Sequence, residues 1–124
     1  MLVTDRAQLV ELAKVWRGAK HVAGAAAAIA IVAPQPQDER QSGLLQYDLG
    51  QATYAMALAA ADLGIGTGHA SVGDQDQARE ILGVPGDHDV AFLLGVGYPA
   101  DRSLHPIAKP NRRPIGEVIH RGRW

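Results

Sequence analysis

The clearest hydrophobic pattern in the chain lies in residues 44–63, LLQYDLGQATYAMALAAADL. Its apolar side chains recur at alternating intervals of four and three residues: Leu45, Leu49, Ala52, Met56, Ala59 and Leu63. This spacing predicts one helix with a continuous apolar face. Further alanines leave the other faces small and weakly polar, so the helix is expected to be covered on more than one side. Two alternatives remain: a core helix within one subunit, which the pattern alone favours, and a helix that also packs against its copy in a dimer.

Glycine, proline and capping residues divide the rest of the chain around this helix. Gly64, Gly66 and Gly68 end it and precede a possible short strand at residues 68–72. Capping residues and short runs rich in Ile and Val predict two further helices, at 4–17 and 74–82, and two buried strands, at 27–33 and 89–97. The remaining segments are expected to be a polar loop at 34–43, an extended stretch at 98–114 and a helical or extended tail at 115–124.

Length and composition exclude several classes of protein. The chain has 124 residues, which fits a single domain over 1–124, and its 12 basic and 13 acidic side chains give a net charge of −1. This balance argues against nucleic acid or an anionic membrane as a partner. The absence of cysteine excludes disulfides, thiolate metal sites and cysteine nucleophiles. The apolar run 22–33 is too short to span a bilayer and lies behind a charged segment, so we expect a cytoplasmic protein.

Three short motifs suggest catalytic or binding sites but fail on spacing or context. The glycines at 64–68 follow a predicted helix, whereas a dinucleotide-binding loop follows a strand. The segment 69–73 lacks the glycine that a hydrolase elbow needs two residues before its serine. Residues 74–85 lack the glycine and the glutamate of a calcium-binding EF-hand loop. The histidines show no pairing at four-residue spacing, so no metal site is predicted.

A cluster of cations stands out near the C-terminus of an otherwise neutral chain. It comprises Lys109, Arg112, Arg113, Arg121 and Arg123. A solvated, charged tail is the simpler interpretation, and the residues alone favour it. The alternative is an anion site, because a guanidinium group binds phosphate oxygens through two parallel hydrogen bonds.

Several motifs, taken in their order along the chain, carry a resemblance to a known family. They are the helix start at 3–6, the strand at 25–32, YDLGQA at 47–52, LAAADLGIGT at 58–67, AREILGVP at 78–85, LGVGYP at 94–99 and RRPIGEV at 112–118. Together they cover nearly the whole chain, and their order and spacing resemble the FMN-dependent nitroreductase family.

The resemblance implies an α+β sandwich in which helices flank a mainly antiparallel sheet. It also implies a homodimer with the helix at 44–63 in the interface, which reverses the preference drawn from the pattern alone. The tail at 100–124 would extend onto the partner subunit. These expectations place FMN at the subunit interface.

The same resemblance implies which residues contact the cofactor. Family members bind the FMN phosphate with a cation matching Arg112 or Arg113, and Lys109 lies close to both in the sequence. Backbone amides after the glycine turn approach the flavin ring. In this chain that segment comprises His69, Ala70, Ser71, Val72 and Gly73. No catalytic acid or base is identified; His69 is a candidate for contact with flavin or substrate, with a purely structural role as the alternative.

Two family features are missing from this sequence. One is an Arg-rich N-terminal arm that grips the FMN phosphate, and the other is a Pro-Ser segment that lines the flavin; the chain resembles the C-terminal two-thirds of a member. Ser71 also stands where many members have glycine. Loss of two arginine contacts to phosphate would cost roughly 3–6 kcal/mol of binding free energy. Three outcomes stay open: the remaining cations compensate, another chain supplies the arm, or flavin binding is lost. A start upstream of Met1 is a further alternative.

The sequence therefore leads to two functional hypotheses. The first is a short flavoprotein that uses NADH or NADPH to reduce a nitroaromatic, a quinone or a similar acceptor through FMN. The second is a non-catalytic relative that binds or stores a flavin or deazaflavin, or acts as an assembly partner. The missing arm favours the second hypothesis, and the retained Arg112-Arg113 pair favours the first.

Overall fold

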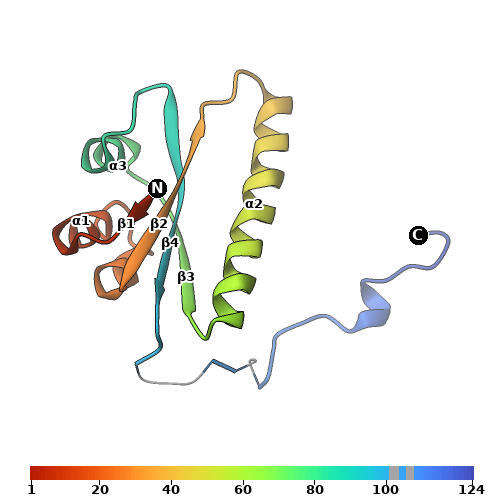
Figure 1. Ribbon diagram of the computed structural model, residues 1–124. Helices are drawn as coiled ribbons and strands as arrows, with labels where there is room; N and C mark the ends of the chain where they lie inside the picture. Colours follow the sequence, from red (N-terminus) through yellow and green to blue (C-terminus); the bar gives the residue numbers. More distant parts are fainter. Residues whose placement is uncertain (101–103, 106–107) are drawn as a thin grey trace.

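The computed structural model describes residues 1–100, 104–105 and 108–124. Within these residues the centre is a four-stranded sheet in the order β1-β2-β4-β3, and every neighbouring pair is antiparallel. The strands are β1 Leu2–Val3, β2 Ala27–Pro34, β3 Gly66–Ser71 and β4 His88–Gly97. β4 pairs with both β2 and β3, so β3 lies at the edge of the sheet (Figure 1).

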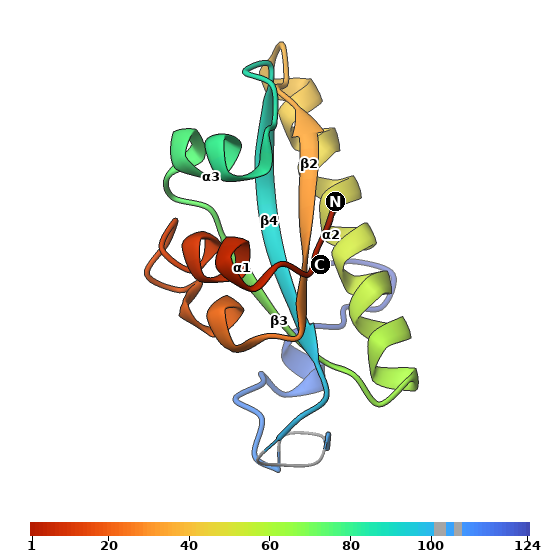
Figure 2. The ribbon, with the colours of Figure 1, turned by 60° about the vertical axis from the view of Figure 1, so that its left-hand side comes forward.

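The helices divide between the two faces of this sheet (Figures 1 and 2). One face, here called the closed face, is covered by α1 Arg6–Leu12, the 3₁₀ helix η1 Lys20–Gly24 and α3 Gln75–Leu82. The other face, here called the open face, carries the single long helix α2 Glu39–Asp62. The expected α+β sandwich with a mainly antiparallel sheet is confirmed. None of the helices in the described part of the chain combines the length and hydropathy that a bilayer span requires.

Each of the three α-helices begins at an aspartate that caps it. The carboxylates of Asp5, Asp38 and Asp74 accept hydrogen bonds from the backbone N–H three residues further on, at 2.9, 2.7 and 2.9 Å. Each bond satisfies one of the donors that a helix start leaves without an intrahelical partner. The local sequence therefore sets where these helices begin.

Two helix boundaries differ from the sequence-based expectation. The helix predicted at 4–17 ends at Leu12, because the backbone then tightens into turns that bond three residues back and bring Val15 into the core. The helix predicted at 44–63 begins earlier, at Glu39, because Asp38 caps it; the predicted loop at 34–43 is correspondingly too long. The two-residue β1 and the short η1 were not predicted, since neither is long enough to show a period.

A β-bulge in β4 decides which side chains reach each face. Ile31 pairs with Phe92 and Val32 with Val90, so Ala91 is the extra residue. As a result Val90 and Leu93 both lie in the buried cluster on the closed face, although they are three residues apart. Phe92 faces α2 on the other side. Strict alternation could not place these three residues in this way.

The C-terminal tail leaves the end of β4 and runs past α2, away from the sheet (Figure 1). It contains one 3₁₀ turn, η2 Ile115–Glu117, and its described residues are exposed. This agrees with the expected extended tail. Part of the stretch expected at 98–114, residues 101–103 and 106–107, lies outside the described residues.

Candidate functional site

A cavity of about 320 Å³ lies between α2 and the open face of the sheet. Its walls come from one stripe of α2 and from alternate residues of β3 and β4: Gly50, Thr53, Tyr54, Ala57, Thr67, His69, Phe92 and Leu94. The α2 residues are spaced at three and four, which puts them on one helix face. The strand residues alternate, which puts them on one sheet face. The helical and strand periodicities therefore explain which residues line the cavity.

The chemistry of the cavity suits a flat, largely apolar ligand. Phe92 and Leu94 form the sheet side, and Gly50 keeps the helix side open because it has no side chain. Thr53 turns its hydroxyl back to its own helix, donating to the Leu49 carbonyl at 2.7 Å. None of the lining residues is acidic. The volume falls at the lower end of the range of small-molecule sites, about 300–1,000 Å³.

The predicted flavin segment at 69–73 divides between the two faces of the sheet. His69 lines the cavity, and Ser71 follows it on the same face of β3. Ala70 is buried in the core, and Val72 packs against that core. Only alternate side chains of this segment can therefore contact a ligand on the open face.

Gly73, the last residue of this segment, is held by the connection that follows α1. Its N–H donates to the Val15 carbonyl at 3.1 Å, and the N–H of Asp74 donates to the same oxygen at 2.9 Å. A Cβ at position 73 would lie 2.2 Å from Cε3 of Trp16. A side chain at position 73 would therefore force the indole ring or the segment to shift.

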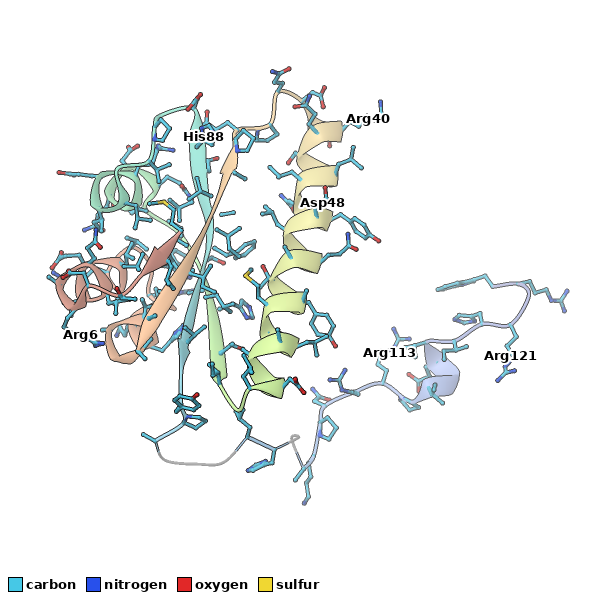
Figure 3. All side chains as sticks on the ribbon, in the orientation of Figure 1. Arg6, Arg40, Asp48, His88, Arg113 and Arg121 are labelled. Atoms are coloured by element: carbon cyan, nitrogen blue, oxygen red, sulfur yellow. The ribbon has the colours of Figure 1, made fainter. Side chains whose placement is uncertain are left out.

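The tail cations do not lie beside the cavity within one chain. Lys109, Arg112 and Arg113 are all exposed, and Figure 3 shows Arg113 on the tail, well away from the sheet. Arg113 contacts Glu117, with Nε 3.5 Å from the carboxylate and a second nitrogen donating to the Glu117 carbonyl at 3.1 Å. The structure thus places His69 in the cavity lining and Ser71 on the same face of β3, but leaves the three cations apart from the cavity.

Charged groups elsewhere cluster around the start of β4. Arg79 lies 2.6 Å from Asp76 and 2.8 Å from Asp89, and the hydrogen bond to Asp76 is the main cause of its raised pKa. His88 lies 2.7 Å from Asp87, and its hydrogen bond lowers the pKa of that carboxyl. Neither cluster borders the cavity. Among the described residues, no group of three or more His, Cys, Asp or Glu side chains could hold a metal ion.

Sequence reasoning missed the helix side of the cavity and its supporting contacts. Small and hydroxyl-bearing residues recur there at helical spacing, at Gly50, Thr53, Tyr54 and Ala57, but the sequence does not show that this helix face adjoins a cavity. The contacts of Trp16 and His21 to the β3 region had no signal in the sequence, since they join residues roughly fifty positions apart.

Comparison with known proteins places this geometry in a family. The family model described as Nitroreductase family matches residues 1–98. A curated protein of Archaeoglobus fulgidus, provisionally described as an NADH dehydrogenase/NAD(P)H nitroreductase, is 28% identical over 128 residues; the match covers 100% of this chain and 72% of that protein.

Two solved structures are similar over the whole chain. The NADPH:FMN oxidoreductase of Vibrio harveyi, complexed with NAD⁺, gives a TM-score of 0.81 at 25% identity, and this chain covers 58% of it. An FMN-dependent nitroreductase of Clostridium difficile gives 0.77 at 20% identity, with 74% of that chain covered. These similarities support a nitroreductase-like oxidoreductase fold. The match over residues 1–98, together with the antiparallel sheet and its long covering helix, shows that this chain belongs to the Nitroreductase family.

Proposed function

We propose that the chain forms an FMN-dependent oxidoreductase that takes electrons from NADH or NADPH and passes them to a nitroaromatic, a quinone or a similar acceptor. The observation that carries the proposal is the apolar cavity beside His69, at the segment where the family resemblance expects the flavin. The relatives from Vibrio harveyi and Clostridium difficile are named for FMN chemistry, which supports the choice of cofactor. A supply of NAD(P)H fits the cytoplasmic location expected from the sequence.

The residues present fit the ring of FMN better than its phosphate. The isoalloxazine ring is flat, and the cavity offers Tyr54, Phe92 and Leu94 as apolar contacts. When bound, the flavin would supply the hydride and electron chemistry. Among the described residues of one chain, no Lys or Arg lines this cavity. A second copy of the chain would have to bring its Arg112 or Arg113 to the phosphate.

The chain's own residues would bind and orient the ring and exclude water. α2 and the sheet enclose the apolar part, and His69 places an imidazole at the wall where it can hold a hydrogen bond. None of the described residues that line the cavity carries a carboxylate, so none of them places a negative charge against an electron-rich ring. The side chains of the cavity would thus act by positioning the ring and by their electrostatic effect on it.

We further propose a homodimer built on the outer face of α2. This face exposes large apolar side chains that are 54–68% accessible: Leu44, Tyr47 and Leu58. The tail adds Ile115, Val118, Ile119 and Trp124, which are also exposed. Large apolar side chains exposed on one helix face are typical of an interface. Charge assists the pairing, since the tail is basic and α2 carries Glu39, Asp48 and Asp62.

A non-catalytic ligand-binding relative remains the second candidate. It is favoured by the distance between the tail cations and the cavity, which leaves a single chain without a phosphate contact at this site. Such a protein would bind a flavin, a deazaflavin or a related flat ligand without turnover, or would act only in assembly.

Flavin binding and reduction decide between these functions. The purified chain is mixed with FMN, passed over a sizing column, and examined by visible absorption; NADPH is then added without oxygen. Retained flavin that bleaches supports the oxidoreductase. Retained flavin that neither NADH nor NADPH bleaches supports the binding protein. Absence of retained flavin at micromolar protein contradicts FMN binding by this chain.

A matched pair of variants locates the flavin. Ala57→Phe fills the cavity from α2, and we expect at least tenfold weaker FMN binding because the ring loses its space. Ala55→Phe places the same side chain on α2 outside the cavity lining and is expected to keep FMN. Equal FMN affinity in the two variants would contradict the assignment of this cavity as the flavin site.

A further inference from the structure

The imidazole of His21 lies on the closed face of the sheet, over a pair of glycines. Gly68 of β3 and Gly95 of β4 are directly opposite each other in the strand register. A Cβ on Gly68 would lie 2.9 Å from the ring, and one on Gly95 would lie 3.3 Å from it. Both positions must therefore lack a side chain for the ring to approach the strands this closely.

Hydrogen-bonding geometry at both ring nitrogens connects three segments of the chain. Nε2 lies 2.9 Å from the Gly68 carbonyl oxygen, and Nδ1 lies 3.1 Å from the Gly18 carbonyl oxygen. Carbonyl oxygens only accept, so each contact is a hydrogen bond when that nitrogen carries a proton. His21 thus links the α1–η1 connection to the edge strand of the sheet.

The stretch of chain next to Gly68 is the wall of the cavity on the opposite face. β3 pairs with a strand on one side only, among the described residues. α2 packs on its open face. Residues 15–21 add contacts at two further points: His21 contacts Gly68, and the Val15 carbonyl and the Trp16 ring contact Gly73, just after the strand. Residues 69–72 lie between these two attachments and carry His69 and Ser71 on the cavity side.

No ion pair between residues that the structure describes takes part in this attachment. Arg6 of α1 and Tyr98 after β4 line the same recess as His21, and no acidic residue does. Arg6 itself donates to the Ala23 and Ala25 carbonyls. Hydrogen bonds and close packing on the two glycines therefore hold the ring.

We propose that His21 is a positioning residue for the candidate site: by holding the Gly68 carbonyl it sets the position of residues 69–72 at the cavity wall. The identification of the ligand as flavin rests on the proposed function, whereas the attachment itself is a property of the ligand-free chain. His21 does not line the cavity on the open face. It would act through β3, in contrast to His69.

Two substitutions separate the hydrogen bonds from the packing. His21→Phe keeps a ring over the glycines but removes both ring nitrogens, and with them any hydrogen bond to the Gly68 carbonyl. His21→Gln keeps one N–H that can reach the Gly68 carbonyl. His88→Phe is the matched control, because it removes a histidine whose Nδ1 contacts Asp87, away from the cavity.

The first readout is amide hydrogen exchange in the ligand-free full chain. For His21→Phe we expect roughly three- to tenfold faster exchange at residues 69–72, with the core amides of α1 unchanged. His21→Gln should restore most of the protection, and His88→Phe should leave these residues as in the wild type. Unchanged exchange at 69–72 in His21→Phe, or a glutamine variant as fast as the phenylalanine one, overturns the proposal.

The second readout is the visible circular dichroism of bound FMN, which reports the asymmetry of the ring's surroundings. We expect an altered band in His21→Phe and recovery in His21→Gln. An unaltered band in His21→Phe, with FMN bound by both variants, counts against positioning. If the wild type binds no FMN, the proposed function fails, while hydrogen exchange still decides whether His21 holds the strand.

Discussion

The two faces of the sheet differ in how completely they are covered. On the closed face the side chains of Leu9, Leu12 and Leu93 are fully buried beneath two α-helices and a 3₁₀ helix. On the open face α2 runs for 24 residues without burying one of them completely. A helix that long, in contact with a sheet yet nowhere fully covered, is typical of surface left for a ligand or a second subunit.

The closed face therefore contributes most of the stability, whereas the open face carries the candidate site. Buried apolar area stabilises the chain mostly through the closed face. The open face carries the cavity, and the outer side of α2 exposes Leu44, Tyr47 and Leu58. The connection after α1 joins the two, because it contacts the closed face and holds the strand that forms the cavity wall.

The largest expected effect tests the closed face directly. Leu12→Ala should reduce the free energy of unfolding by about 2–5 kcal/mol, because it removes a fully buried side chain and leaves a cavity. Leu49→Ala, at a half-buried position of α2, should cost less than half as much. Urea denaturation measures both. Equal losses would mean that the open face contributes as much stability as the closed one.

The second prediction concerns the contact between Trp16 and Gly73, at the end of segment 69–73. Gly73→Ala places a Cβ 2.2 Å from the indole ring, so the ring or the segment must shift. We expect a loss of about 1–3 kcal/mol in unfolding free energy and a change in Trp16 fluorescence.

Gly86→Ala is its control, because an added Cβ there meets nothing within 4 Å. It should be neutral or slightly stabilising, since alanine restricts the unfolded chain. If both variants lose the same free energy of unfolding, packing of Trp16 on Gly73 does not hold residues 69–73 in place.

A third prediction concerns the outer side of α2. Leu58→Asp should halve the particle mass measured by sedimentation, because it places a charge in the proposed dimer interface. Stability of the single chain should change by no more than about 0.5 kcal/mol, as the side chain is exposed. Val10→Asp, at an exposed position of α1, should leave the mass unchanged. A dimer that survives Leu58→Asp but not Val10→Asp would place the interface on the closed side.

The smallest effect is a pH dependence far from both the cavity and α2. The His88 hydrogen bond lowers the pKa of Asp87 below its usual value, so the ionised carboxylate is favoured by folding. Its contribution is present above the pKa of the unfolded chain, about 3.9, and is lost as the pH falls through the folded value. The difference in Tm between wild type and Asp87→Asn should therefore shrink between about pH 5 and pH 2.5. A difference that grows over this range would contradict the direction of the shift.

Short-range chemistry made much of the fold predictable. The strands at 27–33 and 89–97 and the helix at 74–82 lie within a residue or two of their observed bounds, since capping residues and short apolar runs act locally. The resemblance singled out residues 69–73 for flavin contact, and of these His69 lines the cavity; the contact with flavin stays a prediction. The helix wall of the cavity at Thr53 and Tyr54 was missed, since the sequence does not show which face of a helix adjoins a cavity.

Interactions between residues close in the sequence can be predicted from the sequence alone, whereas interactions between distant residues depend on the tertiary structure. Asp5, Asp38 and Asp74 set helix starts through hydrogen bonds to residues three positions away, which the sequence shows directly. By contrast, the side chains of β3 alternate between the two faces of the sheet, but the sequence does not show which face is buried. That depends on the elements that pack on each face. Tertiary structure therefore decided that His69 faces the cavity while Ala70 enters the core, and that His21 reaches Gly68 across 47 positions of sequence.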